Sequence, residues 1–378
     1  MNQFIQSEEF LFIGIFLSSF ITTLLLIPRI RNTTLKLGFI DNPDSRSSHT
    51  NSIPTLGGIA FYISLILTLF ILQKKINSSI IITLLVSLSI IFFTGLKDDL
   101  KNISPKIKMM GQLIAVSLLM IHSEFYIFSL HGFLGMHVLP SFIGIPISIF
   151  LLIAVINAYN LIDGIDGLAS IVGIVVAFSF AMLFYNLELY SYVSICIALI
   201  SMLLAFLRYN FSTRKKIFMG DTGSLVIGFF LGLLGLRLLS LDFDTLPFIA
   251  IPRNSIPLLV LAILIVPTFD VSRVIFIRVI KKMSITSPDR NHIHHLLIDT
   301  GLSHKKASLL VGGVNFFIVF LMYFSLKIVG FNISIILFCL LFLVFSYLFL
   351  VINKGYSATK IKVKIKKKTT RFINFFSL

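Results

Sequence analysis

The sequence predicts an all-α, polytopic membrane protein, and its composition and the positions of its acidic residues support this. Of its 378 residues 57% are hydrophobic and only 13% are charged, and the mean hydropathy is +0.99. About 25% of the residues of a soluble globular domain are charged, so this composition excludes that class. The main acidic clusters stand at the ends of apolar stretches, where a carboxylate avoids the cost of the membrane interior.

About eleven apolar stretches approach the length, roughly 20 residues, that a helix needs to cross the hydrocarbon of a membrane. The fourth stretch is short, and only residues 160–166 separate the fifth from the sixth, so ten spans is an alternative. In chain order, we predict spans at residues 8–28, 55–73, 79–96, 109–123, 141–159, 167–185, 190–207, 222–240, 256–277, 307–327 and 332–352.

The basic residues predict the orientation, because cytoplasmic loops retain Lys and Arg. With eleven spans, most of the 32 basic residues fall on one side, which places the N-terminus outside and the C-terminus in the cytoplasm. Residues 1–353 are then an integral membrane domain, and residues 354–378 are a basic cytoplasmic tail attracted to anionic membrane lipid. No basic patch is interleaved with exposed aromatic residues outside the spans, so we expect no nucleic-acid partner.

Asp98 and Asp99 follow the third predicted span at its cytoplasmic end. Adjacent carboxylates repel each other unless a cation or a shared proton relieves the repulsion. The pair therefore indicates either a Mg²⁺ site or a carboxylate with a raised pKa that acts as a base. The alternative is a solvated loop pair offset by Lys97 and Lys101.

The connection between the fifth and sixth spans is the most specific acidic cluster. Asn157, Asn160 and Asp163 are spaced three residues apart, which places them on one face of a helix. Asp166 follows, and Gly164 and Gly167 permit a sharp turn. A purely structural helix end seldom needs two amides and two carboxylates, so this cluster predicts a functional site.

Asp221 lies between two glycines just before the eighth span. A helix N-terminus is an anion site, and flanking glycines allow a metal-bound phosphate to approach the backbone. An ordinary helix N-cap, formed by Asp221 or Thr222, explains the same residues equally well.

The loop after the ninth span contains a cluster of histidines, His292, His294 and His295, preceded by Arg290. Zinc is disfavoured because no Cys or distant His completes a ligand set, and the carboxylates suit Mg²⁺ better. With Arg290, the histidines would donate hydrogen bonds to phosphate oxygens. Asp270 and Arg273, three residues apart in the ninth span, are predicted to form a structural ion pair.

In their order along the chain, these motifs resemble the polyprenyl-phosphate N-acetylhexosamine-1-phosphate transferases (glycosyltransferase family 4). The His-Ile-His-His form resembles the undecaprenyl-phosphate GlcNAc-1-phosphate transferase branch, and Ser47 stands where the family commonly has Lys. The motifs that carry the resemblance are Gly57 with Gly58, Asp98 with Asp99, Lys108 with Gln112, residues 160–167, residues 220–224, Asp270 and residues 289–295.

The resemblance implies a reaction in which undecaprenyl phosphate attacks the β-phosphate of a UDP-N-acetylhexosamine, such as UDP-GlcNAc, and releases UMP. It implies Mg²⁺, with Mn²⁺ as an alternative, held by Asp221 with Asp99 or Asp163. Asp98 would accept a proton from the lipid phosphate or steer it. The implied catalytic residues are Asp98, Asp99, Asp163 and Asp166, and the implied substrate-binding residues are Asn160, Lys108, Gln112, Arg290, His292, His294, His295, Gly57, Gly58, Arg46 and His49.

Several alternatives stay open at this point. The sugar could be another UDP-N-acetylhexosamine, and Asp98 could attack phosphorus itself to form a covalent intermediate. A transporter would also place carboxylates among spans, although transporters usually hold them near the membrane midplane and contain paired repeats. The family often forms homodimers, and the implied location is the bacterial cytoplasmic membrane with the site on the cytoplasmic face.

Overall fold

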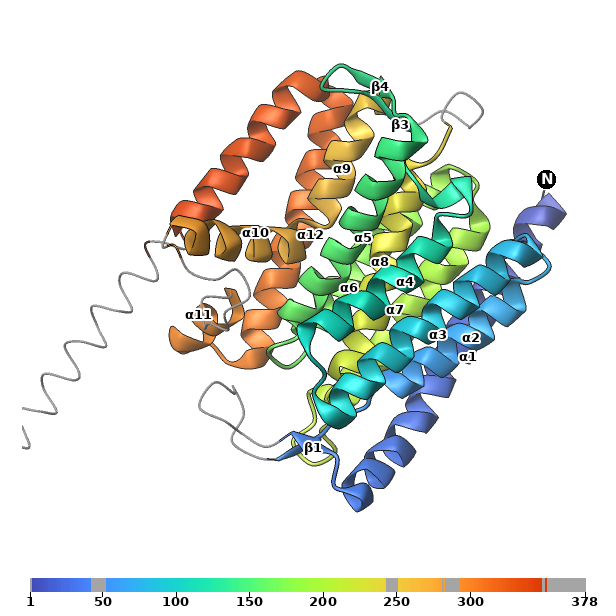
Figure 1. The fold of residues 1–378 in the computed structure, drawn as a ribbon, viewed down its shortest axis with the longest axis vertical. Helices are drawn as coiled ribbons and strands as arrows, with labels where there is room; N and C mark the ends of the chain where they lie inside the picture. Colours follow the sequence, from blue (N-terminus) through green and yellow to red (C-terminus); the bar gives the residue numbers. More distant parts are fainter. Residues whose placement is uncertain are drawn as a thin grey trace, which may run out of the picture.

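The computed structural model describes residues 2–41, 52–242, 251–280, 282, 293–348 and 351, which form a helical bundle (Figure 1). Two short antiparallel hairpins stand at the helix ends: β1 (Ile40–Asp41) with β2 (Ile53–Pro54), and β3 (Ser129–Phe133) with β4 (Met136–Val138). The helices are α1 (Asn2–Leu37), α2 (Gly58–Leu72), α3 (Ser78–Lys101), α4 (Pro105–Leu119), α5 (Ser141–Ile162), α6 (Leu168–Asn186), α7 (Tyr190–Asn210), α8 (Gly220–Leu239), α9 (Ile256–Ile263), α10 (Ile265–Ile280), α11 (Ile293–Asp299), α12 (His304–Ile328) and a further helix, Gly330–Leu348.

Helices that could cross a membrane make up most of the described chain. Eight are long and apolar enough, and the bent pair α9 and α10 would make nine. A helix lies at each of the eleven predicted spans, although α2 and α4 have only 15 residues each. The polytopic class is confirmed, and α5 and α6 are separate helices. The count of eleven spans and the orientation of the termini stay predictions.

The ninth predicted span is corrected by the structure, because residues 256–277 do not form one straight helix. The axes of α9 and α10 differ by 74°, and α10 runs across the direction of α9 (Figure 1). Pro267 has no N–H to donate to the carbonyl of Ile263, and its ring crowds that carbonyl, so the helix breaks here. After the break, the N–H and the hydroxyl of Thr268 both donate to the carbonyl of Leu264, at 3.2 and 2.6 Å.

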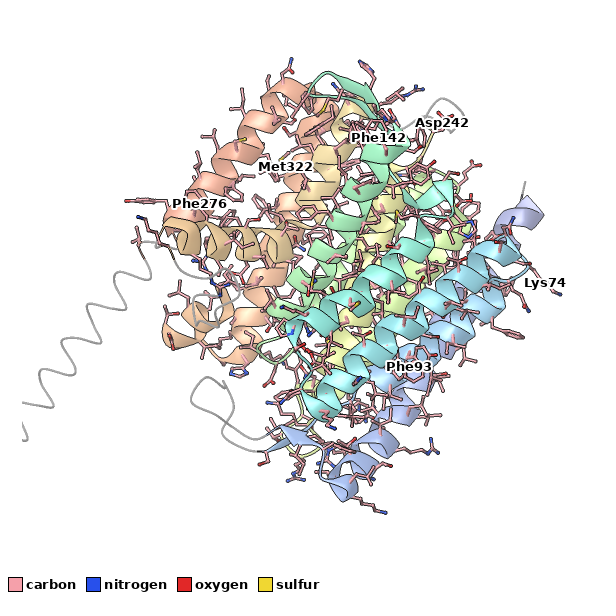
Figure 2. All side chains as sticks on the ribbon, in the orientation of Figure 1. Lys74, Phe93, Phe142, Asp242, Phe276 and Met322 are labelled. Carbon is pink, nitrogen blue, oxygen red and sulfur yellow. The ribbon has the colours of Figure 1, made fainter. Side chains whose placement is uncertain are left out.

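The outer surface of the bundle carries large apolar side chains, as a lipid-facing surface requires. Phe93 on α3, Phe142 on α5 and Phe276 on α10 all point away from the bundle (Figure 2). Phe276 is 66% exposed, although two arginines of the same helix, Arg273 and Arg278, are buried. Helix α10 therefore exposes the apolar side chain of Phe276, whereas the side chains of its two arginines are buried in the bundle.

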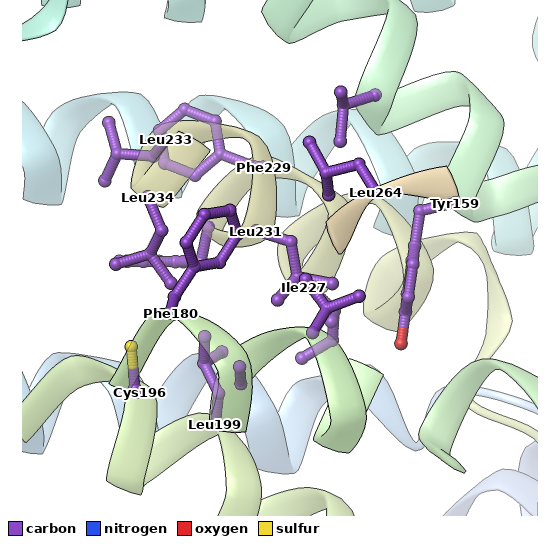
Figure 3. Close-up of a cluster of buried hydrophobic side chains, with 14 of the residues drawn as sticks. Tyr159, Phe180, Cys196, Leu199, Ile227, Phe229, Leu231, Leu233, Leu234 and Leu264 are labelled. Atoms are coloured by element: carbon purple, nitrogen blue, oxygen red, sulfur yellow. The ribbon is translucent and has the colours of Figure 1, made fainter. Parts of the chain in front are cut away.

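Helix α8 is the axis of the bundle and is buried along almost its whole length. Its side chains meet those of α6, including Phe180, and of α7, including Leu199 (Figure 3). A Cβ on Gly232 would come within 2.5 Å of Leu152 on α5, so this glycine lets the two helices approach closely. The close packing fixes the N-terminal end of α8, which carries Asp221.

Candidate active site

Four helix ends meet around the ammonium group of Lys108, at the start of α4. Its Nζ lies 3.0 Å from Oδ2 of Asp98, near the end of α3, and it also contacts Oδ2 of Asp221 at the start of α8. A third contact, at 3.3 Å, joins Nζ to Oδ1 of Asn160 at the end of α5. One cation thus bridges two carboxylates that are far apart in the sequence.

The amide nitrogen of Asn160 forms further hydrogen bonds within this group of residues. Its Nδ2 donates to Oδ1 of Asp221 and to Oγ of Ser224, each at 2.7 Å. Both oxygens of Asp221 therefore have partners, Asn160 on one and Lys108 on the other. The motifs predicted to form a site from Asp98, Lys108, Asn160 and Asp221 are joined in the structure.

Asp99 has a different environment from its neighbour Asp98, because it caps the N-terminus of α8. Its Oδ1 accepts from the backbone N–H of Asp221 at 2.8 Å, and its Oδ2 accepts from the N–H of Thr222 at 2.9 Å and from the Thr222 hydroxyl. The interpretation of Asp221 or Thr222 as the N-cap is therefore wrong: a residue of α3 supplies the cap. The side chain of Asp221 is left for Lys108 and Asn160.

Glycines allow three segments to converge on the start of α8. The N–H groups of Gly57 and Gly58 donate to the carbonyls of Phe218 and Met219 at 3.0 and 2.9 Å. A Cβ on Gly58 would lie 2.1 Å from the backbone N of Gly223, so only glycine fits. These contacts give Gly57 and Gly58 a part in the backbone packing that supports the site, and their predicted role in substrate binding stays a prediction.

Gly220, just before Asp221, also has to be glycine. It has a φ of +69°, which favours glycine, and a Cβ there would lie 2.4 Å from Oδ2 of Asp99. The glycine next to Asp221 therefore makes room for the Asp99 cap, a role that the sequence did not reveal.

Gln112, also predicted as substrate-binding, lies on α4 and faces α5. It is fully buried, and its amide pairs reciprocally with that of Asn157 on α5, at 2.6 and 3.3 Å. Gln112 therefore joins α4 to α5, and its role in substrate binding stays a prediction.

Asp163 is the carboxylate of the site that has no partner in the described part of the chain. It follows the last residue of α5, and no described side chain or N–H forms a hydrogen bond or ion pair with its carboxyl group. Burial first, and then the negative charges of Asp221, Asp99 and Asp166, raise the pKa of Asp163 to about 8. A cation placed beside Asp163 would relieve this repulsion.

Asp166, in contrast, is neutralised by the protein itself. Lys216, in the loop before α8, donates to its Oδ2 at 2.6 Å, and Nδ1 of His304, the first residue of α12, lies 3.1 Å from the same oxygen. Burial opposes ionisation, but these two hydrogen bonds and charges hold the pKa of Asp166 below its usual value. Sequence reasoning missed Lys216 and His304, because neither stands in a motif.

The other predicted residues fall in the segment around α11 or in the first loop. Arg46, His49, Arg290 and His292 lie outside the described residues, and so does the tail 354–378. His294 and His295 belong to α11, but their side chains are outside the described part. Asp270 reaches this segment: its Oδ1 accepts from the N–H of Ile293 at 2.9 Å and lies 3.5 Å from Arg273, which confirms the predicted ion pair.

The described carboxylates offer a divalent cation a limited set of ligands. Within the described ranges no group of three or more His, Cys, Asp or Glu side chains is close enough to hold a metal ion. Mg²⁺ usually takes only one or two protein carboxylates and completes its shell with water and substrate phosphates. The unpartnered carboxyl group of Asp163, among like charges, fits such a ligand.

Comparison with known proteins defines the class of protein. Residues 81–239 match the model of glycosyl transferase family 4. A Bacillus subtilis protein described as a probable undecaprenyl-phosphate N-acetylglucosaminyl 1-phosphate transferase is 31% identical over 303 residues, which cover 80% of this chain and 81% of its own length. The chain therefore belongs to glycosyl transferase family 4, as its motifs predicted.

Two relatives from other bacteria carry a similar description. The undecaprenyl-phosphate alpha-N-acetylglucosaminyl 1-phosphate transferase of Yersinia pestis is 30% identical over 315 residues, 82% of each chain. The protein of the same description from Escherichia coli (strain K12) is 31% identical over 300 residues, 78% of each chain. With the apolar helices, these relatives make the chain a multi-pass membrane transferase.

Proposed function

We propose that this protein transfers N-acetylhexosamine-1-phosphate, with GlcNAc as the favoured sugar, from a UDP-sugar to undecaprenyl phosphate and releases UMP. The observation that carries the proposal is the junction of Asp98, Asn160 and Asp221 around Lys108 at one end of the bundle. The names of the relatives support undecaprenyl phosphate as the acceptor and N-acetylglucosaminyl 1-phosphate as the transferred group, while the UDP donor follows from the resemblance of the motifs. The product would begin the synthesis of a lipid-linked glycan.

The carboxylates of Asp221 and Asp163 are our choice of ligands for Mg²⁺, or for Mn²⁺ in its place. Asp99 is less suitable, because it already accepts three hydrogen bonds and a carboxylate has about four acceptor positions. When bound, the ion would neutralise the diphosphate and stabilise the charge that develops on the departing UMP.

Lys108 and Asp98 are the residues that act on the phosphates in this proposal. Lys108 has its ammonium at the centre of the junction and would orient a phosphate oxygen. Asp98 accepts from the N–H of Ile103 at 2.9 Å, so its carboxyl group is held in place to take a proton from the lipid phosphate. We favour direct attack by the lipid phosphate over a covalent aspartyl intermediate.

The site is placed at the cytoplasmic face of the bacterial inner membrane in this proposal. Basic residues gather at the same end of the bundle as Asp98, among them Arg31, Lys101 and Lys216. The position of these carboxylates at helix ends also argues against a transporter, which would hold them near the midplane.

The test is release of UMP by the purified protein in detergent with UDP-GlcNAc, undecaprenyl phosphate and Mg²⁺. We expect release that requires both the lipid and the ion and that Asp98→Asn reduces by roughly a hundredfold. A panel of UDP-N-acetylhexosamines, with identification of the lipid product, assigns the sugar. Wild-type protein that forms no lipid-linked product from any member of the panel would refute the proposed function.

A further inference from the structure

Three parts of the chain meet at Asp166, and two of them belong to none of the predicted motifs. Lys216 from the loop before α8 and His304 from α12 both contact Oδ2 of Asp166, at 2.6 and 3.1 Å. The hydroxyl of Ser308, also on α12, donates to the backbone carbonyl of Asp166 at 2.7 Å. The side chain and the backbone of one residue are thus held at the same time.

The two contacts from α12 act as one clamp. His304 and Ser308 are four residues apart, so they project from the same face of the helix on successive turns. Nδ1 of His304 lies 3.4 Å from the backbone N of Asp166 and 3.1 Å from its carboxylate. We assign Nδ1 as the donor to the carboxylate, because this contact is the shorter one and a carboxylate oxygen can only accept; in the other tautomer Nδ1 would accept the backbone N–H of Asp166 instead.

The clamp holds the short turn that carries Asp163. This turn comprises residues 163–167 between α5 and α6. At its far end the N–H of Gly167 donates to Oδ1 of Asn210 at 2.6 Å. At its near end the N–H groups of Asp163 and Gly164 donate to the carbonyls of Asn160 and Ile162. Because the carboxyl group of Asp163 has no described partner of its own, its position depends on how both ends of the turn are held.

The loop that carries Lys216 is itself hydrogen-bonded to another helix, so Asp166 is also held on the side opposite α12. Arg31 on α1 donates to the backbone carbonyls of Arg214 and Lys216, each at 3.2 Å. The loop that presents Lys216 to Asp166 is therefore tied to α1. His304 and Ser308 together connect Asp166 to α12, and residues 300–303 alone separate α12 from α11, where His294 and His295 lie.

We propose that His304 is a positioning residue, which fixes the 163–167 turn to α12 and thereby holds the Asp163 carboxyl group in its place at the end of α5. The inference rests on the proposed function, since it assigns His304 a part in the same site. It acts through Asp166 and requires no contact between His304 and a substrate.

The test compares three substitutions of His304 that differ in where they place a donor. In His304→Asn the amide nitrogen takes the position of Nδ1, whereas in His304→Gln it takes that of Nε2, and His304→Leu has no donor. We expect His304→Leu and His304→Gln to lower kcat for UMP release by roughly tenfold or more, because a misplaced group of the site is costly. His304→Asn should restore most of the activity, and the KM for undecaprenyl phosphate should stay unchanged.

A second readout does not depend on turnover. Mg²⁺ with UMP should raise the melting temperature of the wild-type protein, because a ligand that binds only the folded state stabilises it. The rise should be smaller for His304→Leu and His304→Gln and restored for His304→Asn. Lys306→Ala, an exposed change two residues further along α12, is the matched control and should behave as the wild type.

The outcomes separate this inference from the proposed function. The role of His304 is overturned if His304→Gln has wild-type activity and a wild-type melting response to Mg²⁺ with UMP. It is also overturned if His304→Asn has no more activity and no larger melting response than His304→Gln. If His304→Leu does not fold, the Asn and Gln pair still decides. If the wild-type protein releases no UMP but is stabilised by Mg²⁺ with UMP, the proposed function is refuted, and the melting comparison decides the role of His304. If the wild-type protein shows neither UMP release nor stabilisation, both the proposed function and the role of His304 are refuted.

Discussion

The cap that Asp99 places on α8 leads to a quantitative prediction for Asp99→Ala. The substitution leaves three donors without an acceptor, namely the N–H of Asp221, the N–H of Thr222 and the hydroxyl of Thr222. A buried donor left unsatisfied costs about 1–3 kcal/mol, and loss of an N-cap costs about 0.5–2 kcal/mol. Because water enters part of the space, we expect a loss of about 2–4 kcal/mol in the free energy of unfolding.

Thermal unfolding of the detergent-solubilised protein, without substrate or metal, measures this loss. Asp99→Asn should lie between the wild type and Asp99→Ala, since its amide oxygen replaces one of the two acceptor atoms. Lys97→Ala, an exposed change on the same helix, is the control and should melt as the wild type does. Unchanged melting of Asp99→Ala would show that this carboxylate does not hold the α8 terminus, and the assignment of Asp163 over Asp99 as metal ligand would lose its basis.

Three further predictions concern packing, charge and pH. Gly58→Ala should destabilise the protein by about 2 kcal/mol through the clash with Gly223, while Gly14→Ala, inside α1 with nothing within 4 Å, should melt at or slightly above the wild type in the same assay. Lys108→Met leaves two carboxylates without their cation, and we expect UMP release to fall roughly a hundredfold; activity near that of the wild type would contradict its role at the junction. The pKa of Asp163 is raised from 3.8 to about 8, so the folded state binds the proton more tightly and metal-free stability should fall as pH rises through this interval. Asp163→Asn should flatten that dependence in melting curves with a chelator, and an unchanged slope counts against the assigned environment.

The helices and the polar residues of the site could be predicted locally, but some of their roles could not. The interpretation of Asp221 as an N-cap used only neighbours in the sequence, whereas the cap comes from Asp99, more than a hundred residues earlier. The resemblance gave Gln112 only a binding role, whereas the structure shows that it is buried and pairs with Asn157. Lys216 was one more basic residue in a loop until the fold brought it to Asp166.

The amino-acid sequence alone determined that this chain is a polytopic membrane protein of the transferase family, with its acidic motifs at span ends. This was possible because each residue has its own free energy of transfer into a membrane, so the spans can be located along the sequence without knowledge of the fold. Only the tertiary structure decided which of these carboxylates are paired and which has no partner among the described residues. Asp98 and Asp221 share Lys108, Asp99 caps α8 and Asp166 meets Lys216 and His304, so Asp163 alone among these five has no described partner. That distribution depends on distances between helices, because an ion pair or a hydrogen bond acts only over a few ångströms.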